Sequence, residues 1–211
     1  CVREGPEHHG GRLHGGGRPG RPRLPEGPAG GEGVGGGAGT GPGTSRREDA
    51  ARGRGCERFV YTSARHEQDA YRVERPQVQW DFDATVPAVT RDRFPGMQTD
   101  IALGPRPDTP TDRALTIDTK FYGDTLQAHH DRQSYHSANL YQLFTYLKNA
   151  ETKGDPYTRA EGLLLYPTTG PEIRDAARIQ CHRLRIATID LAQDWPGIRR
   201  DLLRLIEGAP T

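Results

Sequence analysis

Cysteine is scarce in this chain. Its 211 residues contain three cysteines, Cys1, Cys56 and Cys181, which are far apart and form no Cys-x-x-Cys pair. An odd number of widely spaced cysteines argues against both a disulfide framework and a zinc site. No apolar run approaches the roughly 20 residues that a membrane-spanning helix needs, and no signal-peptide pattern opens the chain. We therefore expect a soluble protein of the reducing cytoplasm that has no membrane partner.

An excess of charge of one sign is also lacking. The formal net charge is +1, because 29 lysines and arginines are balanced by 28 aspartates and glutamates. A strongly basic field over the whole protein, which is common in nucleic-acid-binding domains, is therefore excluded. Any binding of nucleic acid must come from local patches.

Glycine is abundant but unevenly distributed, since 19 of the 27 glycines precede residue 56. Residues 1–55 are rich in Gly, Pro and Arg and contain too few apolar side chains to offset the entropy of ordering. We predict that residues 1–55 are a disordered low-complexity tail and that residues 56–211 form one domain. Because the chain begins without methionine and its composition changes abruptly at Cys56, a fragment and a misread upstream region both stay open as interpretations.

The domain reads as a mixed set of helices and strands. Apolar residues at helical spacing predict helices near residues 57–71, 137–149 and 195–206, the second capped by Ser134 or Ser137. The third is predicted to start at Asp194 and to stop at Gly208. Strands are expected at 73–82, 160–167 and 178–191, and a loop or poor strand at 85–95. This order predicts an α/β or α+β fold, with a single mixed sheet flanked by helices.

Residues 97–122 are the most informative stretch. Two short β-like runs, separated by a Pro, Asp and Thr-rich turn, predict a hairpin. Because strand side chains alternate, Asp118 and Lys120 should project from one face, opposite to Thr119. In the expected register, Asp100 on the first strand reaches the same face.

Two carboxylates and one lysine at a single point have a plain chemical use. The carboxylates can hold Mg²⁺, or Mn²⁺ in its place, which keeps several waters and also binds phosphate oxygens. The lysine can orient the attacking water and offset charge that develops on the phosphate. The implied reaction is hydrolysis of a phosphodiester. The competing interpretation is an ordinary edge hairpin in which Asp118 and Lys120 form a solvated ion pair, because Asp-x-Lys triplets are common.

Several short runs, taken together in order, resemble the PD-(D/E)xK nuclease superfamily and in particular the McrC-type nuclease of McrBC restriction systems. The resemblance covers about residues 57–206. It depends on Glu57-Arg58-Phe59-Val60, Met97-Gln98-Thr99-Asp100-Ile101, Ile117-Asp118-Thr119-Lys120-Phe121-Tyr122, the run from Ser137 to Leu147, and Gly162-Leu163-Leu164-Leu165-Tyr166-Pro167. It implies a restriction-endonuclease-like core.

The resemblance assigns roles to the residues of the hairpin. Asp100 is similar to the aspartate of the family's first catalytic strand, although Thr99 stands where the family usually has proline. Asp118 and Lys120 match its acidic-x-Lys element. These three residues are the implied catalytic group, with Asp100 and Asp118 as metal ligands.

Three further residues lie on the predicted helices. Glu57 matches the acidic residue of the family's first core helix, which contributes to metal binding, but Cys56 replaces the hydrophobic residue that usually precedes it. Without the resemblance, Glu57 would read as a carboxylate favoured by the dipole of a first helical turn. Gln142 and Tyr146 match the Gln-x-x-x-Tyr element of RecB-like nucleases, which is associated with DNA contact. Alone, they would read as a half-exposed helix face.

The implied function is a Mg²⁺-dependent DNA endonuclease, the cleavage subunit of a 5-methylcytosine-dependent restriction system used in antiphage defence. Its partners would be double-stranded DNA and an McrB-like, GTP-hydrolysing AAA+ subunit. Nothing in residues 1–55 resembles the additional N-terminal domain with which McrC-like proteins engage McrB. Two alternatives stay open: a RecB-like exonuclease or repair nuclease, and a catalytically silent DNA-binding or scaffolding remnant.

Overall fold

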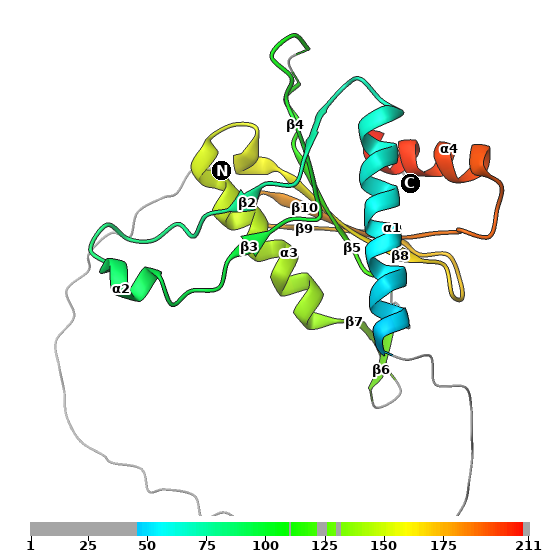
Figure 1. The fold of residues 1–211 in the computed structure, drawn as a ribbon, viewed down its shortest axis with the longest axis horizontal. Helices are drawn as coiled ribbons and strands as arrows, with labels where there is room; N and C mark the ends of the chain where they lie inside the picture. Colours follow the sequence, from blue (N-terminus) through cyan, green and yellow to red (C-terminus); the bar gives the residue numbers. More distant parts are fainter. Residues whose placement is uncertain (1–45, 110, 122–125, 130–131, 209–211) are drawn as a thin grey trace, which may run out of the picture. The chain divides into compact units, whose positions relative to one another are not determined.

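The structure is a computed structural model that describes residues 46–109, 111–121, 126–129 and 132–208. These residues belong to one compact unit, Thr44–Thr211, built on a six-stranded sheet (Figure 1). The order of the strands in that sheet is β1 (Arg72–Glu74), β4 (Ile101–Gly104), β5 (Leu115–Thr119), β8 (Glu161–Pro167), β10 (His182–Ile189) and β9 (Arg174–Ile179).

The sheet is mixed, as predicted. β8 lies at its centre and runs parallel to β5 on one side and to β10 on the other. The pairs β4–β5, β1–β4 and β9–β10 are antiparallel. The continuous apolar run of β8 suits this position, because a central strand covered on both faces has no polar side to present to water.

Helices cover both faces of the sheet. On one face, α1 (Arg46–His66) and α4 (Trp195–Glu207) pack over a core that contains Leu163 and Leu165 of β8. On the other face, α3 (Ser137–Ala150) packs over Leu164 and Tyr166. Consecutive β8 residues thus enter opposite cores, as the two-residue period of a strand requires. The prediction of one mixed sheet flanked by helices, an α+β fold, is confirmed.

The helix predictions hold best at α4. The Asp194 side chain caps its first turn by accepting a hydrogen bond from the Gly197 N–H at 3.1 Å, with Pro196 in that turn. Gly208 ends the helix with a φ of +71°, a left-handed conformation that glycine adopts without strain. At α3 the predicted serine cap is wrong, because His136 occupies the cap position and Ser137 is already helical.

The first helix begins earlier than expected. α1 starts at Arg46, so it crosses the boundary predicted at Cys56 and includes part of the segment that was expected to be disordered. Residues 46–52 are Arg, Glu, Asp and Ala, of which all but Asp are good helix formers, so local propensity accounts for the extension. The rest of the predicted tail, residues 1–45, lies outside the described residues.

Two of the predicted strands are each divided. The strand expected at 73–82 breaks at Arg75 and Pro76, because the proline nitrogen cannot donate a hydrogen bond to a neighbouring strand. Before the break, β1 joins the main sheet. After it, β2 (Gln77–Val78) pairs with β3 (Met97–Gln98) in a separate two-stranded ribbon. The strand expected at 178–191 is instead the hairpin of β9 and β10. Gln180, with a φ of +53°, lies in its turn.

Smaller differences lie in the polar segments. The loop expected at 85–95 contains a short helix, α2 (Ala88–Arg91), and a hairpin of β6 (Leu126–His129) and β7 (Arg132–Tyr135) precedes α3. Cys56 is a free thiol. Within the described ranges, no helix is long and apolar enough to cross a membrane.

Gly162 of β8 allows α3 to approach the sheet closely. A Cβ atom at this position would lie 2.9 Å from Leu143 Cδ2 and 2.9 Å from Leu147 Cδ1, and both leucines are fully buried. We expect Gly162→Ala to lower the free energy of unfolding by about 1–2 kcal/mol through overpacking. Gly55→Ala in α1 is the control, since a Cβ there meets nothing within 4 Å. The control should stabilise by about 0.5–1 kcal/mol. Urea unfolding that shows the same sign for both variants would contradict this account.

Candidate active site

The register of β4 and β5 places two carboxylates side by side. Ile101 is paired with Ile117, so the next step of the same antiparallel register brings Asp100 opposite Asp118. Residues that are directly opposite in an antiparallel pair project from the same face. Ile117 faces the core under α1, so Asp118 faces the α3 side of the sheet. The convergence predicted from the alternation of the hairpin is therefore present in the fold.

Asp118 is buried, with 1% of its surface exposed. Its Oδ2 atom lies 2.8 Å from Lys120 Nζ but accepts no hydrogen bond of good geometry from the described residues. Burial raises the pKa of this carboxyl to about 6; Lys120 lowers it, and the negative charges of Asp100 and Glu57 raise it further. A carboxylate that is buried, half-satisfied and crowded by like charge is a common feature of functional sites.

Asp100 follows the end of β3 and is held by the end of β5. Its Oδ2 accepts hydrogen bonds from the Thr119 backbone N–H at 2.8 Å and from the Thr119 hydroxyl at 2.9 Å. These bonds fix one oxygen of the carboxylate. Among the described residues no donor contacts the other oxygen, which stays available to a ligand.

Lys120 connects the carboxylates to α3. Its backbone N–H donates to the Leu165 carbonyl of the central strand at 2.9 Å, which anchors the residue just past β5. Its Nζ donates to Gln142 Oε1 at 3.0 Å, and Gln142 Nε2 in turn lies 2.6 Å from the Tyr146 hydroxyl. The side chain is 12% exposed, but its surroundings are polar. A buried carboxylate, an ammonium, an amide and a phenol therefore form one connected chain of polar groups.

Gln142 and Tyr146 are one turn apart on α3 and differ in exposure. Gln142 is exposed, whereas Tyr146 is 6% exposed and packs with Val78 and Met97 of the β2–β3 ribbon. Burial raises the pKa of the Tyr146 phenol, and the negative charge of Asp118 adds to the shift. This placement suits Gln142 for contact with a substrate and Tyr146 for holding the Gln142 amide in position.

Glu57 lies on α1 at the edge of the site. Burial and the negative charge of Asp100 raise its pKa, whereas Arg75 and Lys120 lower it. Its carboxylate is turned to the Arg75 guanidinium, with Oε1 3.0 Å from Nη1, and that guanidinium also stacks over the Tyr61 ring at 4.5 Å. Glu57 is thus within electrostatic reach of the two aspartates, but it is engaged elsewhere.

The donor set fits a cation held by two carboxylates better than one held by three. In the part of the chain that the structure describes, no group of three or more His, Cys, Asp or Glu side chains is arranged to hold a metal ion. Asp118 Oδ2 is contacted by the Lys120 ammonium alone, one oxygen of Asp100 accepts no hydrogen bond from the described residues, and Mg²⁺ is commonly bound by one or two carboxylates and several waters. Glu57 would join this set only after leaving Arg75.

Two residues of the site were not foreseen from the sequence. Thr119 was assigned to the opposite face by strand alternation, yet it binds Asp100, because Asp100 lies just outside β4 and reaches the backbone at the end of β5. Arg75 lies in an irregular stretch before Pro76 and belongs to no spacing pattern. The only signal for Arg75 in the sequence is a positive charge a few residues after the first core helix.

Comparison with known proteins supports the predicted resemblance. No protein-family model matches the chain. The chain is 27% identical over 156 residues to the type IV methyl-directed restriction enzyme EcoKMcrBC of Escherichia coli (strain K12), which takes in 72% of this chain and 41% of that protein. The chain therefore spans less than half the length of this relative. The similarity predicted from the short sequence runs, to McrBC-type restriction enzymes, is confirmed as a distant one.

Proposed function

We propose that this chain is the Mg²⁺-dependent DNA endonuclease of an McrBC-like, modification-dependent restriction system. The observation that carries the proposal is the meeting of Asp100, Asp118 and Lys120 on one face of the sheet, with the buried Asp118 carboxylate 2.8 Å from the Lys120 ammonium. Distant similarity to a methyl-directed restriction enzyme favours DNA over other phosphodiesters. A solvated ion pair on an edge hairpin is a poor description, because Asp118 is buried and β5 lies inside the sheet.

Each side chain has a role in this proposal. Mg²⁺, or Mn²⁺ in its place, would supply Lewis-acid polarisation of the phosphate and a water of lowered pKa when bound. Asp100 and Asp118 would hold it. Lys120 stabilises negative charge that develops on the phosphate and orients the attacking water, while Gln142 keeps the ammonium aimed at that point. Glu57 would serve as an outer ligand only if it left its ion pair with Arg75.

The partners follow from the same proposal. The domain should contact backbone phosphates rather than base edges, so recognition of methylated cytosine would lie on a motor subunit that hydrolyses GTP. The setting would be the cytoplasm, where DNA and GTP are available. The RecB-like exonuclease and the catalytically silent remnant remain the alternatives, and a single assay separates them.

The assay uses supercoiled plasmid that carries 5-methylcytosine, incubated with the full chain, Mg²⁺ and a supplied McrB-type motor with GTP. We expect linear product, because only an endonuclease opens a closed circle. An exonuclease would degrade linear DNA and leave the circle intact. If both substrates survive although circular dichroism shows folded protein, and Mn²⁺ does not restore cleavage, the catalytically silent alternative is correct and the proposed function is wrong.

A further inference from the structure

Two cavities lie side by side at the β9–β10 hairpin. One, of about 380 Å³, lies between the hairpin and α4, and the other, of about 250 Å³, lies beside the residues that precede β5 and β8. Arg183 lines both cavities. Together they are lined by seven arginines and five carboxylates; the arginines are Arg113, Arg159, Arg174, Arg178, Arg183, Arg185 and Arg204.

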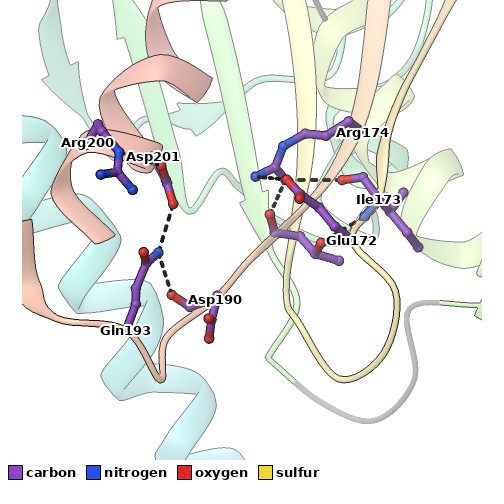
Figure 2. A network of polar contacts seen from close by, with 8 residues as sticks. Glu172, Ile173, Arg174, Asp190, Gln193, Arg200 and Asp201 are labelled. Carbon is purple, nitrogen blue, oxygen red and sulfur yellow. Dashed lines mark hydrogen bonds and ion pairs between the residues drawn. The ribbon is translucent and has the colours of Figure 1, made fainter. Parts of the chain in front are cut away.

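Most of the carboxylates already have partners within the chain. Figure 2 shows Glu172 turned to Arg174 and Asp201 turned to Gln193. Asp175 accepts a hydrogen bond from the Tyr135 hydroxyl, and Glu161 pairs with two arginines. The seven arginines outnumber the five carboxylates, so the lining of the two cavities keeps a net positive charge.

Four of the arginines form no ion pair with a described residue. Arg159, Arg178, Arg183 and Arg204, which we call the arginine strip, have no carboxylate within ion-pair distance among the described residues. Arg178 and Arg183 are moreover directly opposite each other in the β9–β10 ladder. Like charges in that position repel and destabilise the hairpin. An anion that bridges the two would relieve this repulsion.

A buried guanidinium lies behind the strip. Arg185 is 8% exposed and lines the larger cavity. Its Nη1 donates to the Leu205 carbonyl at 2.7 Å and its Nε lies 3.2 Å from Glu161 Oε2, but its buried Nη2 has no hydrogen-bond acceptor in the described structure. Fixed positive charge in a concave, partly dry site strengthens attraction to anions.

The strip lies at the other end of the sheet from the candidate active site. β10 and β8 run parallel to β5, and Arg183 stands near the start of β10, whereas Asp118 and Lys120 stand at the end of β5. Within β5 itself, the distance along the strand from Leu115 to Thr119 is about 13 Å. Lys120 faces α3, while the larger cavity borders α4. The strip is therefore separate from the candidate active site.

We propose that the arginine strip binds the phosphate backbone of a second segment of duplex DNA, distinct from the segment that is cleaved. This inference rests on the proposed function for its choice of DNA as the anion. The strip contains arginine and no lysine, and the planar guanidinium fork matches phosphate oxygens in a bidentate manner. Concave sites of this size admit phosphate groups, whereas a protein surface would need a flatter and larger patch.

The test measures DNA binding without cleavage. The full chain carrying Asp118→Asn is titrated into a fluorescent 20-base-pair duplex in EDTA, and anisotropy is recorded over a range of salt concentrations. We expect Arg178→Gln, Arg183→Gln and Arg204→Gln together to weaken binding about tenfold or more and to reduce the salt slope by roughly 2–3, since each phosphate contact contributes about 0.9. A matched control removes three arginines that have acidic partners and line neither cavity, by Arg72→Gln, Arg106→Gln and Arg199→Gln.

A bridging assay tests the second segment. Duplex on beads should retain a fluorescent second duplex in the presence of the parent or the control, and the strip variant should lose this retention. Unchanged affinity in the strip variant, an equal loss in the control, or no bridging by the parent would each overturn the inference. Failure of the proposed function gives a different result. In that case the chain with Asp118 intact does not cleave plasmid, although the arginine strip still binds DNA.

Discussion

Replacing Asp118 by asparagine should abolish DNA cleavage and, at pH 8, stabilise the protein. The carboxyl is 1% exposed, and its pKa is raised from 3.8 to about 6, chiefly by burial. Between these values the folded state binds a proton that the unfolded state has released, so stability falls as the pH rises from about 4 to above 6. The ionised carboxylate then costs about 3 kcal/mol, which asparagine avoids. Cleavage should fall about 10³-fold or more, since the metal's contribution is several kcal/mol.

Urea unfolding at pH 5 and pH 8 measures this effect. The parent should lose stability between the two values, and Asp118→Asn should lose much less. Saturating Mg²⁺ should stabilise the parent by about 2.7 kcal/mol at 100 times its dissociation constant, and should not stabilise the variant. Asp69→Asn, at an exposed carboxylate, is the control and should behave as the parent. A variant that is less stable than the parent at pH 8, or that still cleaves DNA, would show that Asp118 has a structural role instead.

The parts of the fold that local chemistry decides were predictable from the sequence. α4 carries all of its signals in sequence, from the Asp194 cap to the left-handed Gly208, and the structure follows each of them. The apolar run of β8 likewise predicts a strand covered on both faces. The pairing of β4 with β5 followed from two β-like runs and a turn. In each case a short stretch of residues was sufficient.

The parts that depend on distant contacts were missed. The break at Pro76 is visible in sequence, but only the separate pairing of β2 with β3 shows why the chain leaves the main sheet there. The turn at Gln180 uses a left-handed residue that is not glycine, so no turn signal announces the β9–β10 hairpin. Both errors came from treating one alternating run as one strand.

The same division holds within the candidate site. Asp100, Asp118 and Lys120 converge because strand alternation and one hairpin register decide their positions, and both are local. Glu57 instead depends on how α1 packs beside Arg75, a contact between residues on separate elements. The sequence therefore predicted which side chains gather at the site but not which of them is diverted by a neighbouring cation.

Lys120→Met should separate charge stabilisation from metal binding. We expect cleavage to fall roughly 10²–10³-fold, as for other groups that stabilise developing charge, while the metal ligands stay in place. Because Lys120 lowers the pKa of Asp118, its removal should raise that pKa further and move the pH midpoint of Mg²⁺ binding upward. Calorimetric titration with Mg²⁺ from pH 5 to pH 8 records this shift independently of cleavage.

Two further variants show whether the ammonium itself matters. Lys120→Arg keeps the charge but not the geometry of the contact with Gln142, so Mg²⁺ binding should keep the parent's pH midpoint while cleavage remains low. Gln142→Leu keeps the ammonium and loosens its position, so cleavage should fall less than in Lys120→Met. If Lys120→Met cleaves DNA at the parent's rate at pH 8 with saturating Mg²⁺, Lys120 serves only to neutralise Asp118, and the attacking water must be oriented by another group.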